Sequence, residues 1–442
     1  MTTAATTMPE VFVRKSSGLV RVMSARSAFV YNVLTMGLIF PWTYLWAPGA
    51  LPGGQLVWGI LLAMVLEIPI ALAYVWLSTA LPRSGGDYVF QSRVLGGGIG
   101  FTLVFSGFVI WILQWVALSG WLLSALGFAP LFLGLGAATG STAFVDLATW
   151  FTTGTGILVT SIGNALVALL ILISGFKNYV RLQRVMWVAI LLSFGTMVVV
   201  LASTATADVP GRLDAFSAAI GGSPTFTADS IAAAQAGGVE LNPAFSLLAT
   251  LLIAPIAWTS LQWATYSAQQ NGEIKSAGNF RSQLYIIVGS LVLTGVLLAV
   301  LAFVLERSIG TEFLYVAGAG YWGAADVSLA GSYLWPNIIA TAIAGALLPF
   351  RAKSLYEASP GAAYKVGGFP LVSIVGIAGA IAGVVFLYLF LTNDTLGLTS
   401  DLAYQVVAGV LVFSLGWYIV TYFVRRSSGI NVDYAFKEIP PE

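Results

Sequence analysis

Residues 32–42 read NVLTMGLIFPW, and residues 254–263 read APIAWTSLQW. Each stretch places a proline inside an apolar run long enough to cross a bilayer as a helix, and the first adds a glycine. Proline removes one backbone donor and frees the carbonyl four residues earlier, at a depth without water. The breaks fall in the first and sixth runs, which enter the membrane from opposite sides. They indicate either an inverted repeat with a binding site at the midplane or two ordinary proline kinks.

The composition indicates a membrane protein with many spans. Of the 442 residues, 58% are hydrophobic and 8% are charged, against roughly a quarter charged in soluble domains. The apolar residues gather in runs of about 20, and a single segment can cross lipid only as a helix. We predict an all-α integral membrane protein with ten spans, at about 27–47, 56–80, 99–124, 155–174, 183–203, 246–268, 283–305, 332–350, 371–392 and 403–424.

The basic residues orient these spans. With the N-terminus in the cytoplasm, all of the 19 Lys and Arg residues except Arg212 and Arg307 fall in cytoplasmic segments. The positive-inside rule produces such an asymmetry, so we predict a cell-membrane protein with both termini in the cytoplasm. Residues 1–442 then form a single transmembrane domain. Its parts outside the membrane include a cytoplasmic segment at 1–26, long extracellular connections at 204–245 and 306–331, and a cytoplasmic tail at 425–442.

The inventory of reactive side chains argues against an enzyme. The chain has no cysteine and no histidine, which removes disulfides, thiolate chemistry, the usual general base and the commonest metal ligand. We therefore predict no catalytic residue, no metal and no cofactor. The sequence shows no ring of charged residues and no carbonyl filter motif, so we do not expect an ion channel. We also predict no nucleic-acid partner, and the oligomeric state stays open.

Glu67 is the single ionisable residue deep inside a predicted span, in the sequence VLEIP at residues 65–69. A carboxylate at that depth costs roughly 2.5–3.5 kcal/mol on insertion scales. It must therefore be protonated, paired or beside a wet cavity. Glu67 is either a candidate proton carrier or a protonated structural glutamate bonded to the backbone of a neighbouring helix.

Two charged turns carry a family resemblance. Directly after the second span, residues 80–96 read ALPRSGGDYVFQSRVLG, which resembles the Pro-Arg-Ser-Gly-Gly-acidic-Tyr signature of the amino acid-polyamine-organocation (APC) family of permeases. GEIK at residues 272–275 resembles the Gly-Glu-Val-Lys segment after the family's sixth helix. These turns either anchor helix ends at the interface or latch an inner gate. The residues of that gate would be Arg83, Gly85, Gly86, Asp87, Glu273 and Lys275.

The resemblance implies the fold shared with sodium-coupled neurotransmitter transporters, in which two inverted five-helix repeats surround a substrate held by unwound helices 1 and 6. The α-carboxylate of the substrate would meet backbone amides of helix 1, and its α-amino group would meet carbonyls of both helices. Exposed amides at a half-helix N-terminus favour an anion. The substrate-binding residues carried over in this way are Thr35, Met36, Gly37, Trp258, Thr259, Ser260 and Gln262.

The function implied is secondary active transport of amino acids by alternating access. Because Glu67 is the one acid near the breaks, neutral or apolar amino acids are favoured over polyamines. A non-transporting membrane substrate sensor or a structural subunit on the same fold is the alternative. Helix 5, at residues 187–194, lacks the lysine that replaces sodium in some proton-coupled members. The coupling ion stays open, with a proton favoured over sodium.

The family usually has twelve spans, two more than we predict. FRAKSLYEASP at residues 350–360 looks like the connection between the family's tenth and eleventh helices, and RRSSG at residues 425–429 looks like the segment after its twelfth. On this interpretation about two helices are missing near 332–350. A ten-span core is the competing interpretation. The family's eighth helix often completes a sodium site, so sodium coupling depends on the choice.

Overall fold

The computed structural model describes residues 21–110, 118–321, 335–396 and 399–437. Helices dominate these residues, and a two-stranded hairpin pairs β1 (Lys365–Val366) antiparallel with β2 (Phe369–Pro370). Within the described ranges, eight helices are long and apolar enough to cross a membrane. The predicted all-α, multi-pass membrane protein is therefore confirmed.

Helices lie at each of the ten predicted segments. The first segment holds α1 (Ala25–Met36), η1 (Trp42–Trp46) and α2 (Ala47–Ala50), and the second holds α3 (Leu56–Ala80). The remaining segments hold α5 (Gly97–Val104) with η2 (Phe105–Ile110), α9 (Gly154–Ile173), α10 (Phe176–Ala202), α13 (Leu247–Leu261) with η5 (Gln262–Glu273), α14 (Phe280–Leu284) with η6 (Tyr285–Gly289) and α15 (Ser290–Ile309), α18 (Trp335–Arg351), α20 (Leu371–Thr392) and α21 (Asp401–Ser427). The number of helices that cross the bilayer and the sidedness of the termini stay predictions.

The helical region that begins near the third predicted span extends beyond the predicted end at residue 124. Helical structure continues past residue 124 through η3 (Leu122–Phe128) and α7 (Ala129–Thr139), then returns in α8 (Thr142–Thr152). Pro130 falls in the first turn of α7, where a helix tolerates a residue without an N–H group. The connection at 204–245 also contains helices, α11 (Val209–Ala219) and α12 (Phe226–Ala236), and residues after 309 form α16 (Thr311–Tyr321).

The predicted loss of a helix pair falls partly outside the described residues. Residues 322–334 are among those without a description, and α18 occupies 335–351. Short elements complete the described chain: α4 (Gly86–Val94), η4 (Thr206–Asp208), α19 (Lys353–Ala358), η7 (Pro360–Ala363), η8 (Asp394–Leu396) and α22 (Val432–Lys437).

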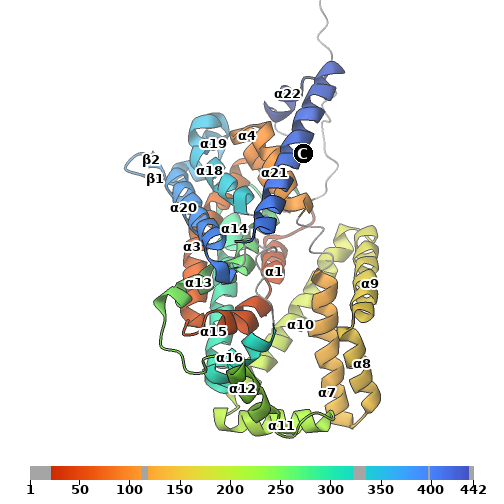
Figure 1. The fold of residues 1–442 in the computed structure, drawn as a ribbon. Helices are drawn as coiled ribbons and strands as arrows, with labels where there is room; N and C mark the ends of the chain where they lie inside the picture. The colour runs from red at the N-terminus through yellow and green to blue at the C-terminus, as the bar shows by residue number, and fades with distance from the viewer. Residues whose placement is uncertain (1–20, 111–117, 322–334, 397–398, 438–442) are drawn as a thin grey trace, which may run out of the picture.

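A tightly packed bundle forms the core around α3. Helices α13, α15, α18 and α20 all pack against α3, and α1 packs against α10, α15 and η5 (Figure 1). Small residues allow close approach: a Cβ on Gly59 of α3 would lie 2.4 Å from a methyl carbon of Ile253 on α13. Membrane helices rely on such contacts because lipid supplies no hydrophobic force between them.

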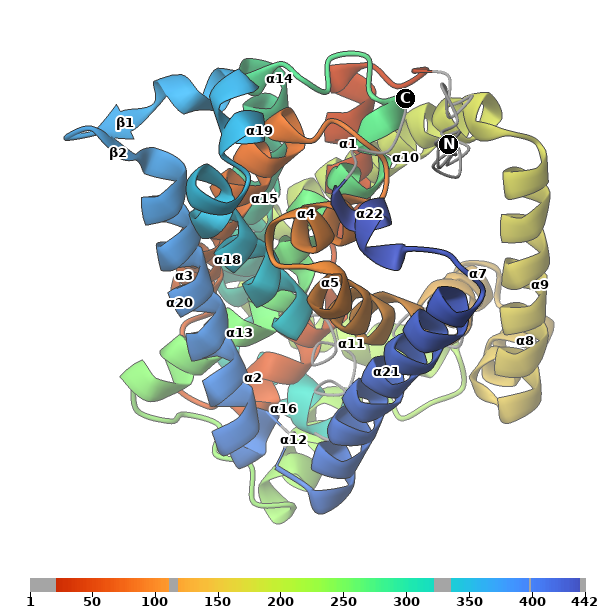
Figure 2. The ribbon, with the colours of Figure 1, turned by 90° about the horizontal axis from the view of Figure 1, so that it is seen from above.

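A second group of helices lies at the periphery. The view from above shows α7, α8 and α9 on one side of the bundle and α21 on another (Figure 2). In the most apolar windows of α9, α10 and α21, 11%, 6% and 6% of residues are buried. Such exposed apolar surfaces would be unstable in water and are stable against lipid acyl chains. These helices therefore form the lipid-facing layer, and the candidate site lies in the bundle beside α3.

Candidate functional site

The first helix is broken where the sequence predicts. Helix α1 ends at Met36, and the helical path resumes at Trp42, directly after Pro41. Between them Gly37 has φ 77° and ψ 146°, a conformation that a side chain would strain. A Cβ on Gly37 would meet no heavy atom within 4 Å. The break therefore borders open space rather than a packed interface.

The break leaves backbone groups without helical partners. The amide of Gly37 bonds to the Val33 carbonyl, while the N–H groups of residues 38–40 make no hydrogen bond within the described chain. The carbonyls of Leu34 and Thr35 lose the partners that a continued helix would give them. Donors and acceptors thus occur a few residues apart at the middle of the predicted span.

The sixth helix differs from the prediction. Helix α13 runs without interruption through Pro255 to Leu261, so the predicted unwinding at Trp258, Thr259 and Ser260 is wrong. One proline removes one helical hydrogen bond, and the surrounding turns keep theirs. The change comes at Gln262, where a 12-residue 3₁₀ segment, η5, begins. Runs of 3₁₀ helix beyond about four residues are uncommon, and such stretches often mark hinges.

Side-chain hydrogen bonds join the broken first helix to the sixth helix. The Ser260 hydroxyl donates to the Met36 carbonyl at 2.7 Å, across the break in the first helix. Four residues earlier in α1, the Asn32 side-chain amide donates to the Ser267 hydroxyl at 3.0 Å and its oxygen accepts from the Ser267 N–H at 2.9 Å. Asn32 was not among the predicted site residues. The sequence does show an amide inside an apolar run, and the structure shows that this amide is fully buried.

Of the other predicted substrate residues, Thr35 is half-buried, and Thr259 and Gln262 are buried. Thr35 donates its hydroxyl to the Tyr31 carbonyl at 2.7 Å, and Thr259 donates to the Ile256 carbonyl at 2.6 Å. Gln262 is 3% exposed, and its Nε2 donates to the Thr259 carbonyl at 3.0 Å. The Oε1 atom of Gln262 finds no hydrogen-bond partner in the described part of the chain. A buried acceptor of this kind is available to a ligand donor.

Glu67 lies beside this site. It sits near the middle of α3 with 0% exposure, and its Oε2 accepts a hydrogen bond from Trp258 Nε1 at 2.5 Å. Its Oε1 has no hydrogen-bond partner among the described residues. The Trp258 ring also packs against Phe386 of α20, with 5.0 Å between ring centroids. The hydrogen-bond partner of Glu67 is therefore a side chain of α13, not a helix backbone. That partner, Trp258, lies two residues before Ser260 in the chain.

The two charged turns meet in the structure. Gly85, with φ 102°, donates its N–H to the Gln269 carbonyl at 2.9 Å. A Cβ on Gly272 would lie 2.7 Å from the Ser84 hydroxyl. The segment before α1 joins them: Met23 donates its N–H to the Glu273 carbonyl at 3.0 Å and accepts from the Lys275 N–H at 2.9 Å. Arg83, beside them, is partly buried and donates to the Pro82 carbonyl at 3.3 Å.

Asp87, in the first of these two charged turns, is buried. Its carboxyl oxygens accept hydrogen bonds from the Tyr74 hydroxyl, from the Thr341 hydroxyl at 2.6 Å and from Gln269 Nε2 at 2.5 Å. Burial raises the pKa of Asp87, although these hydrogen bonds lower it. The donors come from α3, η5 and α18. Thr341 is 254 residues away in the chain, so local sequence could not reveal this cluster.

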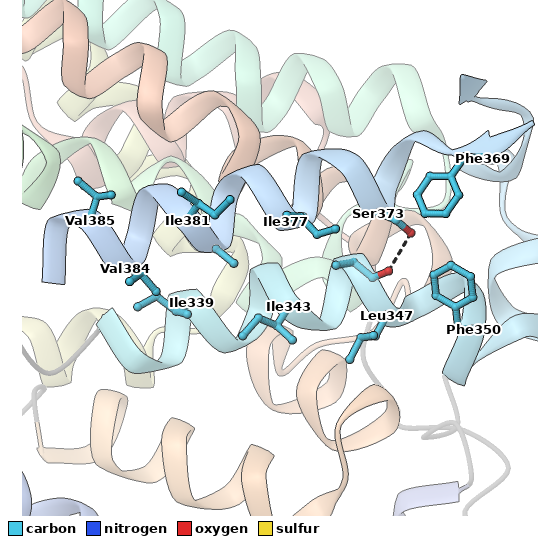
Figure 3. Close-up of a pocket in the computed structure, with 13 residues that line it drawn as sticks. Ile339, Ile343, Leu347, Phe350, Phe369, Ser373, Ile377, Ile381, Val384 and Val385 are labelled. Carbon is cyan, nitrogen blue, oxygen red and sulfur yellow. Dashed lines mark hydrogen bonds between the residues drawn. The ribbon is translucent and has the colours of Figure 1, made fainter. Parts of the chain in front are cut away.

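A cavity of about 460 Å³ lies elsewhere, between α18 and α20 (Figure 3). Apolar side chains line it, including Ile339, Ile377 and Val384. Its single hydroxyl, on Ser373, donates to the Ala346 carbonyl at 2.8 Å. Among the described residues, none that lines the cavity is charged, so this groove suits acyl chains and not a zwitterionic solute.

The fold and the site define a class: a multi-pass helical membrane protein whose first helix is interrupted beside a polar stretch of the sixth. A family model described as amino acid permease matches residues 26–318. This match covers more than half of the chain and includes both charged turns. The chain therefore belongs to the amino acid permease family, as the resemblance predicted.

Two curated relatives match shorter stretches. The protein named "Putative amino-acid transporter" of Methanocaldococcus jannaschii is 35% identical over 83 residues, which are 19% of this chain and 20% of that protein. The "Uncharacterized protein 399" of Sulfolobus islandicus rod-shaped virus 1 is 35% identical over 78 residues, 17% of this chain and 20% of that protein. The matched stretches thus span about a fifth of the length of each relative.

Proposed function

We propose that this chain is a secondary active transporter of neutral or apolar amino acids that works by alternating access. The break in the first helix at Gly37 carries the proposal, because it exposes donors and acceptors beside open space in an otherwise apolar bundle. Family membership and the name of the archaeal relative support the solute class. Residues 1–442 would form one transmembrane transporter domain, with both termini and residues 425–442 in the cytoplasm and the connections at 204–245 and 306–331 outside.

The broken helix suits the two charged ends of an amino acid. The N–H groups of residues 38–40, which have no partner in the described part of the chain, precede the second half-helix, where the helix dipole favours a carboxylate. The carbonyls of Leu34 and Thr35 end the first half-helix and favour an ammonium group. Gln262 Oε1 offers a further buried acceptor from the sixth helix. These groups fit a zwitterion, and the apolar bundle around them favours an uncharged side chain.

Glu67 is the proposed site of proton coupling. Its carboxyl group is buried and held by Trp258, which shares helix α13 with Thr259 and Ser260. Protonation changes the charge beside helix α13, so it can bias the position of that helix relative to α3. A structural glutamate that stays protonated throughout the cycle is the competing role.

The contacts at the charged turns would close the inner side. Asp87 joins α3, η5 and α18, and Gly85 and Gly272 bring the two turns together. Opening this side requires these hydrogen bonds to separate or the elements to move as a group. Arg83, Gly86, Glu273 and Lys275 belong to the same proposed gate.

Transport by purified protein in liposomes tests the proposal. A panel of radiolabelled amino acids is offered with pH and sodium gradients imposed separately. We expect saturable, stereoselective uptake of neutral amino acids, driven by an inward proton gradient. Glu67→Gln keeps the shape of the side chain and should abolish pH-driven accumulation while leaving exchange of internal for external substrate.

Two controls separate the alternatives. Asp146→Asn changes an exposed acid on α8 and should leave both activities unchanged. Unaltered pH-driven accumulation in Glu67→Gln would remove that residue from the mechanism without affecting the transport proposal. Saturable binding without flux for every amino acid would instead favour a substrate sensor, and neither binding nor flux would favour a structural subunit.

A further inference from the structure

A cavity of about 500 Å³ lies where α4, α5, α21 and α22 meet. Figure 2 shows α22 folded back over this region from the end of α21. Its walls are of two kinds. Phe101 and Phe436 contribute aromatic surface, whereas Tyr88, Arg93, Tyr422 and Arg425 contribute hydroxyl and guanidinium groups. The proposed transport site does not include any of these residues.

Two glycines at the start of α5 allow this cavity to form. A Cβ on Gly97 would lie 2.3 Å from the Phe436 ring, and a Cβ on Gly98 would lie 3.1 Å from the Tyr418 ring. The ring of Tyr418 also lies against Phe101, with 5.8 Å between centroids. Helices α21 and α22 thus pack directly on the backbone of α5. The apolar wall is a defined surface of three helices, not a loose terminal segment.

The polar wall concentrates positive charge. Arg93 is half-buried, and burial lowers the pKa of its guanidinium below the ordinary value. Its Nη1 donates to the Ser92 hydroxyl at 2.6 Å. Arg425 comes from the end of α21. The neighbouring acid, Asp433, accepts from the Tyr422 hydroxyl at 3.1 Å and does not line the cavity. An anion with several oxygens would match this set of donors.

The cavity also opens where a lipid can reach it. Helix α21 is long and apolar enough to span a membrane, and its side chains Val420 and Phe423 are each 64% exposed. The cavity lies beside the C-terminal end of this apolar helix, where a spanning helix meets the headgroup region. Its volume is suited to a headgroup with the adjoining glycerol, while the acyl chains can remain in the bilayer.

We propose that this cavity binds the phosphate of an anionic phospholipid. Arg93 and Arg425 hold the phosphate oxygens, the Tyr88 hydroxyl donates to a remaining oxygen, and the glycerol and first methylene groups lie on Phe101 and Phe436. Basic pockets between membrane helices near the surface commonly hold such headgroups. Free phosphate shares the polar chemistry but would leave the aromatic wall in water.

Native mass spectrometry of the purified full chain tests the proposal. The protein is titrated with dioleoyl phosphatidylglycerol, and in parallel with dioleoyl phosphatidylcholine. We expect preferential retention of phosphatidylglycerol. Arg93→Gln with Arg425→Gln should weaken it by about fivefold per arginine. Arg426→Gln is the matched control, because Arg426 is the next residue along α21 but donates to Tyr422 from outside the cavity. It should change retention by less than about twofold.

Each other result overturns the proposal. Equal retention of the two lipids would show that no anion site exists here. An equal effect of Arg426→Gln and Arg425→Gln would show general surface charge. Displacement of phosphatidylglycerol by millimolar inorganic phosphate would assign the site to the free ion. If the double variant is not monodisperse, Arg425→Gln alone decides, since Arg425 lies on an exposed helix end and its loss should not impair folding.

Discussion

The buried Asp87 cluster predicts a graded loss of stability. In Asp87→Ala the donors of Tyr74, Thr341 and Gln269 lose their acceptor together. A buried donor left without a partner costs about 1–3 kcal/mol, so three would cost about 3–9 kcal/mol. Relief of the buried charge and entry of water into the space offset part of this. We expect a net loss of roughly 3 kcal/mol in the free energy of unfolding, at the low end of that range.

Asp87→Asn should be milder for a structural reason. Tyr74 and Thr341 both donate to Oδ1, which asparagine retains, and Gln269 alone donates to Oδ2. The Gln269 amide can turn to present its oxygen to the new NH₂ group. All three bonds then involve a neutral amide in place of a carboxylate, and relief of the buried charge offsets most of that loss, so the net cost is about 1 kcal/mol.

Chemical unfolding in detergent micelles, followed by the fluorescence of the 14 tryptophans, measures both variants. Asp146→Ala, an exposed acid on α8, is the control and should match the wild type. The reasoning is refuted if Asp87→Ala lies within about 0.5 kcal/mol of the wild type, the spread expected for surface substitutions. It also fails if the alanine and asparagine variants are equally stable.

Three further predictions concern Asp87, Gly37 and Ser260. Burial raises the pKa of Asp87 in the folded state above its ordinary value of 3.8. At a pH between 3.8 and the raised pKa, the folded state therefore binds more protons than the unfolded state. Stability should therefore rise as the pH falls through that window, and the slope should be flatter in Asp87→Asn when unfolding is measured against pH. Gly37→Ala should cost about 1–3 kcal/mol through backbone strain alone, since a Cβ meets nothing there, whereas Gly163→Ala in helix α9, equally open, should be neutral or stabilising by thermal unfolding. Ser260→Ala should cost about 1–3 kcal/mol because the Met36 carbonyl loses its donor; an equal effect of Ser308→Ala, whose hydroxyl bonds within its own helix, would contradict this.

Periodic and compositional signals predicted the bundle well. The limits of α3 and α20 agree with the predicted spans because each is a continuous apolar run between turns. The break after Met36 was also predictable, since glycine and proline stand four residues apart in one run. The sequence prediction left residues 125–154 without a helix, whereas α7 and α8 form there and pack against each other.

The site was less predictable than the fold. The prediction gave Trp258 a role through its backbone, as part of an unwound helix that contacts the substrate. In the structure its indole N–H donates a hydrogen bond to Glu67 instead. That pair joins residues 191 positions apart, so no local pattern contains it. Proline marked the sixth helix correctly as irregular but misplaced the change, because hydrogen-bond type switches at Gln262, not at Pro255. Side-chain partners across the bundle decide such details.

Hydrogen bonds connect the first and sixth helices at three successive positions along their length. The Met23 backbone pairs with the end of η5, Asn32 bonds Ser267, and Ser260 bonds Met36. Three attachments at different heights oppose both sliding and twisting, so we expect the two helices to move together as one unit. A bulky fusion or a bound antibody fragment just before α1 would then displace the sixth helix together with the first. Spin labels on α1 and η5, introduced as cysteines into this cysteine-free chain, should then keep a constant separation while both change distance to α3.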